Sequence, residues 1–123
     1  MPRDALPRGL YVITDARLLP PDQLVARVEQ AILGGAVLVQ YRDKSPNEAM
    51  RLEQAGALHT LCGDYGVPLL INDDAALART IGAAGVHIGQ QDLDLARARA
   101  ILGPSAIIGV SCYNRLDRAR EAV

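Results

Sequence analysis

Residues 34–44 read GGAVLVQYRDK, and this stretch decides the class of fold. Two helix-ending glycines precede a continuous apolar run, AVLV, which then gives way to polar residues. A short strand that is apolar on both sides is typical of a parallel sheet with both faces covered. Gln40, Arg42 and Lys44 then follow at alternating positions, where Gln40 and Arg42 should face the same side. The sequence therefore predicts a strand, over residues 36–42, that leaves a buried core and enters a polar rim.

Four further apolar runs repeat this pattern along the chain. They read LYVIT (10–14), VPLLIN (67–72), GVHIG (85–89) and AIIGVS (106–111). Helix-like sequence separates each run from the next, so hairpins are excluded and the α/β sheet is predicted to be parallel. Both an open doubly wound sheet and a (β/α)8 barrel with five of its eight strands fit such βα repeats. The turn TDARLLPP lacks a GxGxxG phosphate loop, and periodicity alone leaves this choice open.

Local start and stop residues predict the helices. The segment SPNE (45–48) predicts a helix start in which Ser45 is the cap, Pro46 is the first helical residue and Glu48 completes a capping box. That helix should reach about Tyr65 and end at Gly66. The other predicted helices lie between residues 21 and 33, over 74–81, over 93–102 and from about residue 114 onward.

Composition excludes several classes of function. The 123 residues are enough for one domain, and the net charge of −1 provides no basic patch for nucleic acid or a membrane surface. Phe and Trp are absent, which argues against base stacking. Without an apolar leader or a membrane-length segment, the expected location is the cytoplasm. Cys62 and Cys112 belong to no CxxC pair, so both are predicted to be buried free thiols.

Polar residues collect where the predicted strands end, which is where parallel α/β folds bind ligands. These residues are Thr14, Asp15, Gln40, Arg42, Lys44, Asn72, Asp73, Gln91, Asp92 and Ser111. Asp73 and Asp92 each precede a helix, where an aspartate is commonly an N-cap. However, Asp74 and Asp94 are better placed to cap the same helices. The duplication suggests that Asp73 and Asp92 have another task.

The chemistry of this rim is consistent with one kind of ligand. Two carboxylates, which offer oxygen atoms as the only metal ligands, suit Mg²⁺. Arg42 and Lys44 complement phosphate charge, whereas Gln40 and Asn72 can read the edge of a heterocycle. The residues therefore predict a magnesium-dependent site for an organic diphosphate with a polar ring. His87 lies in the middle of a strand and is read as a hydrogen-bonded core histidine, with a site role as the alternative.

At these positions the chain resembles the thiamine-phosphate synthase family, whose members are (β/α)8 barrels. The matching segments are LYVITD, GGAVLVQYRDK, VPLLINDDAALA, GAAGVHIGQQDL and IIGVSCYN. The resemblance implies a transferase that joins 4-amino-2-methyl-5-(diphosphooxymethyl)pyrimidine to thiazole phosphate and releases diphosphate. It implies pyrimidine diphosphate contacts by Gln40, Tyr41, Arg42, Asp43, Lys44, Asn72 and Ser111. It also implies that Asp73 and Asp92 bind Mg²⁺.

The resemblance covers five of the family's eight strands. The T-x-T-K loop and the thiazole phosphate pocket of the family have no counterpart, so residues 1–123 are expected to be the N-terminal part of one barrel domain. Three interpretations stay open: the transferase itself, a non-catalytic fragment that binds only the pyrimidine diphosphate, and a thiazole tautomerase relative. Retention of Gln40, Arg42, Lys44 and Asn72 argues against the third. Open strand edges make self-association an expectation.

Overall fold

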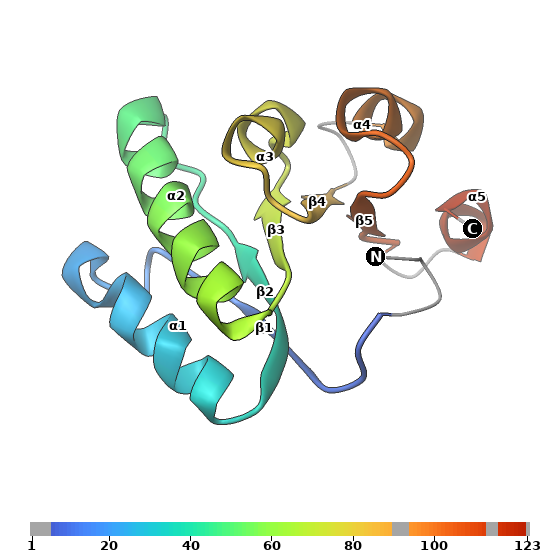
Figure 1. Cartoon of the computed structure of the whole chain (residues 1–123). Helices are drawn as coiled ribbons and strands as arrows, with labels where there is room; N and C mark the ends of the chain where they lie inside the picture. The colour runs from blue at the N-terminus through green and yellow to red at the C-terminus, as the bar shows by residue number, and fades with distance from the viewer. Residues whose placement is uncertain (1–5, 90–93, 113–115, 123) are drawn as a thin grey trace.

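The structure is a computed structural model that describes residues 6–89, 94–112 and 116–122 (Figure 1). Five parallel strands form one sheet in the order β1-β2-β3-β4-β5. The strands are β1 (Leu10–Ile13), β2 (Ala36–Tyr41), β3 (Leu69–Asn72), β4 (Gly85–Ile88) and β5 (Ile107–Val110). Strand order follows chain order without the reversal that defines a doubly wound sheet. The choice left open by the sequence is therefore settled in favour of a curled, barrel-type sheet.

A helix follows each strand. The helical elements are the 3₁₀ helix η2 (Pro21–Gln23), α1 (Leu24–Leu33), α2 (Glu48–Tyr65), α3 (Ala75–Ile81), α4 (Leu95–Leu102) and α5 (Leu116–Ala122). Helices α1 to α4 lie side by side around the outer side of the sheet, each in contact with the next (Figure 1). In the described part of the chain, no helix combines the length and hydropathy needed to span a membrane.

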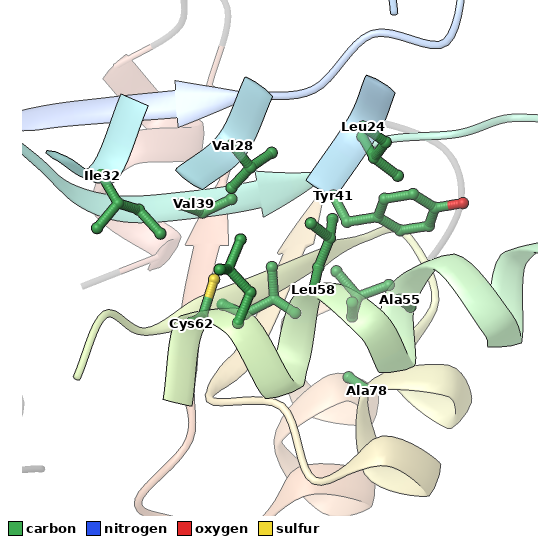
Figure 2. Close-up of a cluster of buried hydrophobic side chains, with 12 residues drawn as sticks. Leu24, Val28, Ile32, Val39, Tyr41, Ala55, Leu58, Cys62 and Ala78 are labelled. Atoms are coloured by element: carbon green, nitrogen blue, oxygen red, sulfur yellow. The ribbon is translucent and has the colours of Figure 1, made fainter. Parts of the chain in front are cut away.

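The main hydrophobic core lies between the sheet and helices α1 and α2. Figure 2 shows Val39 and Tyr41 of β2 facing Leu58 and Cys62 of α2. Val39 and Leu58 are fully buried. Because side chains alternate along a strand, the residues between these positions face the inner, concave side of the sheet. Gln40, which lies between Val39 and Tyr41 on β2, therefore faces the inner side.

Two aspartates cap helices as the sequence predicts. The Asp74 carboxylate accepts a hydrogen bond from the backbone N–H of Leu77 at 2.9 Å, and Asp94 accepts one from Arg97 at 2.7 Å. Helix α3 then ends at Gly82, whose φ of 73° lies in the left-handed region that favours glycine. These caps leave Asp73 without a capping role.

The predicted cap of α2 is wrong. Asn47, not Ser45, is the N-cap, and its side chain accepts a hydrogen bond from the backbone N–H of Met50 at 3.0 Å. Ser45 lies instead in the preceding loop, where its hydroxyl oxygen accepts a hydrogen bond from the backbone N–H of Asn47 at 3.2 Å. With the cap two residues later, Glu48 is the first helical residue and the capping box does not form. Local competition for Ser45 by the loop explains the difference.

We expect Asn47→Ala to lower the free energy of unfolding by about 1 kcal/mol, because it removes the side-chain acceptor at the start of an 18-residue helix. Ser45→Ala is the matched control and should cost less, since Ser45 caps no helix. Urea unfolding monitored by circular dichroism measures both variants. A larger loss for Ser45→Ala would contradict the observed cap.

The two free cysteines differ in their surroundings. Cys62 is buried in the main core, and burial raises the pKa of its thiol to about 11. Cys112 is only partly buried, so the prediction that both thiols are buried is wrong for this residue. Cys112 follows β5, where the chain leaves the sheet, and this position exposes part of its side chain. A thiol with a raised pKa is a poor nucleophile, so Cys62 has a structural role.

Candidate functional site

A hollow of about 350 Å³ opens at the carboxyl ends of β2 and β3. Its lining residues are Asp43, Lys44, Ser45, Arg51, Asn72, Asp73 and Asp74. Four residues that the sequence singles out, Asp43, Lys44, Asn72 and Asp73, therefore meet in one place. They come from two neighbouring strand ends, as expected for ligand sites of parallel sheets.

A second hollow of about 260 Å³ shares Asp43 and Lys44 with the first and extends to Arg42. Asp15 and Arg17 also line it, and their side chains form an ion pair at 2.9 Å. The hydrogen bonds donated by Arg17 lower the pKa of Asp15 to about 2. Within the described ranges, Arg42 and Lys44 form no ion pair. These two cations are therefore available to an anionic ligand.

Asp73 has an unusual backbone conformation. Its φ of 60° makes it the one non-glycine residue with positive φ in the part of the chain that the structure describes. Aspartate tolerates this left-handed region better than most residues, and such outliers gather at functional sites. The turn is held by the Asp73 backbone N–H, which donates to the carbonyl of His87 at 2.8 Å.

The carboxylate of Asp73 is partly engaged. One oxygen accepts from the backbone N–H of Gly89 at 2.9 Å, and the other accepts from the side-chain amide of Asn72 at 3.2 Å. A carboxylate has about four acceptor positions, so this one retains the capacity to bind a cation. Asp92, the other predicted magnesium ligand, lies outside the described residues. Within the described residues, no cluster of three or more His, Cys, Asp or Glu side chains could hold a metal.

Gln40 and Tyr41 point to opposite faces of β2. Gln40 is buried on the inner face, and its amide donates to the Tyr11 hydroxyl at 2.8 Å. Tyr41 belongs to the main core, and its hydroxyl donates to the side-chain oxygen of Gln54 on α2 at 2.6 Å. Strand β2 ends at Tyr41, one residue before the predicted end, and Arg42 is exposed whereas Gln40 is buried.

Ser111 lies beside His87 rather than in the two hollows described above. The Nε2 atom of His87 is 2.8 Å from the Ser111 hydroxyl oxygen. Burial lowers the pKa of His87, and the nearby Asp73 charge acts in the opposite direction. His87 is hydrogen-bonded as predicted, but it is only partly buried and belongs to neither hydrophobic core cluster. Its partner is a predicted site residue.

Sequence reasoning missed Arg51 and Tyr11. Arg51 lines the first hollow and pairs with Asp74 at 3.1 Å, while its buried Nε atom has no hydrogen-bond partner within the described part of the chain. The sequence did contain a signal for Arg51. It is a basic residue near the start of α2, the helix that follows Lys44 in the chain. Nothing in the local sequence connects Tyr11 with Gln40, because they lie on different strands.

Another hollow lies elsewhere, at the amino-terminal ends of the strands. It measures about 790 Å³ and is lined largely by small and apolar residues at the ends of α2, α3 and α4. Arg99 bridges the carbonyls of Gly103 and Ala106 near its edge. That end of a parallel barrel-type sheet serves stability, so its size does not make it the candidate site.

A family model described as "Thiamine monophosphate synthase" matches residues 10–123. The chain belongs to the thiamine monophosphate synthase family. The thiamine-phosphate synthase of Marinobacter nauticus is 54% identical over 121 residues, which is 98% of this chain and 54% of that protein. The thiamine-phosphate synthase of Xylella fastidiosa strain 9a5c is 53% identical, covering 95% of this chain and 49% of the relative.

A solved structure agrees with this assignment to the thiamine monophosphate synthase family. The thiamine phosphate pyrophosphorylase from Pyrococcus furiosus superposes with a TM-score of 0.81 at 36% identity. The match covers 91% of this chain and 53% of that one. The chain thus spans about half the length of the relatives it matches. The barrel-type fold expected from the sequence is confirmed.

Proposed function

We propose that this chain binds 4-amino-2-methyl-5-(diphosphooxymethyl)pyrimidine in the transfer reaction of thiamine-phosphate synthase. The observation that carries the proposal is the first hollow, where Lys44, Asn72 and Asp73 converge beside Arg42, which forms no ion pair with any described residue. A cation, an amide and a carboxylate at one rim match a diphosphate attached to a polar ring. We also infer that residues 1–123 are the N-terminal part of a single barrel domain.

Each rim residue has a role in this proposal. Arg42 offers a two-pronged donor to phosphate oxygens, and Lys44 offers a compact positive charge. The Asn72 amide reads the pyrimidine edge from the inner face, where Gln40 is held by Tyr11. Ser111 donates its hydroxyl to the diphosphate. Arg51 is a further cation at the hollow, and Asp74 holds it in place.

The proposed reaction breaks the bond between the pyrimidine methylene carbon and the diphosphate oxygen. Diphosphate leaves with the electron pair, and the nitrogen of the thiazole phosphate forms the new bond to the resulting carbocation. Arg42 and Lys44 would stabilise the charge that grows on the leaving oxygens. The step requires no general base.

The donor set fits Mg²⁺. Asp73 supplies carboxylate oxygen and keeps unused acceptor capacity, and Mg²⁺ commonly binds through one or two carboxylates together with substrate phosphates. We propose Asp73 and Asp92 as its protein ligands. When bound, the ion would neutralise negative charge on the diphosphate.

Two measurements on the 123-residue chain test the proposal. Isothermal titration calorimetry with the pyrimidine diphosphate should detect binding that strengthens when Mg²⁺ is added. A coupling assay with both substrates then separates the transferase from a chain that only binds. Product formation supports the transferase, while binding without product supports the binding-only alternative. Absence of binding with and without Mg²⁺ would overturn the proposed site.

We expect Arg42→Ala to weaken binding of the pyrimidine diphosphate by about tenfold or more, because it removes a charge-assisted contact worth roughly 1.5–3 kcal/mol. Arg27→Ala is the matched control, since Arg27 is also an arginine but lies on α1 with an exposed side chain. Calorimetry at fixed ionic strength compares the two. Equal losses would mean that general charge, rather than a specific contact, attracts the ligand.

A further inference from the structure

His87 lies on β4, between β3 and β5, and alternates with Val86 and Ile88 of the helix-covered side, so its side chain is on the inner face. It pairs in register with Asn72 of β3 on one side and Gly109 of β5 on the other. Its Nε2 atom contacts the Ser111 hydroxyl oxygen at 2.8 Å. His87 therefore connects the strand end that holds Asn72 with the strand end that holds Ser111.

Gly109 makes room for the imidazole ring. A Cβ atom built at position 109 would lie 2.5 Å from Nδ1 of His87, which is closer than real Cβ atoms approach. The same Nδ1 atom is buried and has no hydrogen-bond partner among the residues that the structure describes. The ring is therefore held against bare backbone on one side and hydrogen-bonded only on the other.

This asymmetry distinguishes the two neutral tautomers of His87. A proton on Nδ1 would be a buried donor with no acceptor among the described residues, and Nε2 would then accept a hydrogen bond from the Ser111 hydroxyl. A proton on Nε2 is donated to the Ser111 oxygen and leaves only a lone pair at Nδ1. Unpaired buried donors are rarer than under-used acceptors, so the second arrangement is favoured.

We propose that His87 carries its proton on Nε2 and donates it to Ser111, so that the Ser111 hydroxyl proton points to a phosphate oxygen of the ligand. His87 is thus a positioning residue that makes Ser111 a donor. In the described residues, His87 is the only side-chain partner of the Ser111 hydroxyl, whose proton is consequently free for a ligand. The phosphate part of this inference rests on the proposed function.

The tautomer can be measured without any ligand. The sequence contains two histidines, so His59→Gln leaves His87 as the single imidazole. Nitrogen-15 NMR of this chain, in buffer alkaline enough to keep the ring neutral, should show the proton on Nε2. A proton on Nδ1 would overturn the assignment. The NMR result decides the tautomer even if the chain binds no diphosphate. A failure to bind diphosphate would count against the proposed function and not against the tautomer.

Binding of inorganic diphosphate with Mg²⁺ tests the consequence for the ligand. In His87→Gln the side-chain amide nitrogen can take the place of Nε2, so the affinity for diphosphate should stay within about threefold of the original. In His87→Asn the amide nitrogen corresponds to Nδ1 instead, and the affinity should fall about tenfold. The loss of diphosphate affinity in His87→Asn should equal the loss in Ser111→Ala. The double variant that combines these two substitutions should lose no more affinity than either one alone. Additive losses, or equal losses in the Gln and Asn variants, would reduce His87 to a packing role. Circular dichroism confirms that each variant is folded.

Discussion

Gly85→Ala is expected to destabilise the chain by at least about 3 kcal/mol, the largest effect we predict for stability. A Cβ atom at position 85 would overlap the carbonyl oxygen of Ile107 and lie 2.6 Å from its carbonyl carbon. These are backbone atoms of the paired strand, so no side chain can turn aside to relieve the overlap. Strands β4 and β5 would have to separate.

Thermal unfolding of Gly85→Ala and Gly56→Ala provides a matched comparison. Gly56 lies inside α2, and a Cβ atom there meets nothing within 4 Å. Alanine at this position should stabilise the chain by about 0.5–1 kcal/mol. Because His87 and Ser111 lie on or directly after the separated strands, Gly85→Ala should also abolish diphosphate binding. Similar stabilities for the two variants would contradict the close approach of β4 and β5.

Asp73→Asn is expected to remove the strengthening of pyrimidine diphosphate binding by Mg²⁺, with little change in stability. Asparagine also tolerates the left-handed φ of 60° and can accept the hydrogen bond from the Gly89 N–H. It lacks the charge that Mg²⁺ requires of its few protein ligands. Calorimetry with and without Mg²⁺ should show a loss of about tenfold or more in the metal-dependent component.

Two controls separate charge from folding in this test. Asp73→Ala loses both the hydrogen bond to Gly89 and the tolerance for left-handed backbone, so it should lower the free energy of unfolding by about 1–3 kcal/mol. Asp64→Asn removes a carboxylate from the far end of α2 and should leave binding unchanged. Full Mg²⁺ dependence in Asp73→Asn would remove Asp73 from the proposed metal site.

Some elements could be predicted from neighbouring residues alone. Asp74 and Asp94 cap the helices that follow them, and Gly66 and Gly82 end helices in left-handed turns. These signals are local, because a cap needs only a side chain and a backbone N–H within three residues. The same reasoning failed at Ser45, since its hydroxyl oxygen is hydrogen-bonded within the preceding loop.

Contacts between separate βα units could not be predicted in this way. The pairs Gln40–Tyr11 and Arg51–Asp74 join residues far apart in the chain. Both form only after the sheet has brought separate βα units together. The sequence correctly predicted polar residues after β1, β2, β3 and β5, whereas Gln91 and Asp92 after β4 lie outside the described residues. It did not predict which of the polar residues would touch.

By itself, the sequence determined the βα order, the parallel sheet and the polar rim, because hydrophobic runs and helix-end residues act over a few positions. Only the tertiary structure decided that strand order follows chain order, that β2 ends before Arg42, and that His87 meets Ser111 over Gly109. Those features depend on register and on close backbone packing between strands. Such distances are set by the assembled sheet, which no short stretch of sequence encodes.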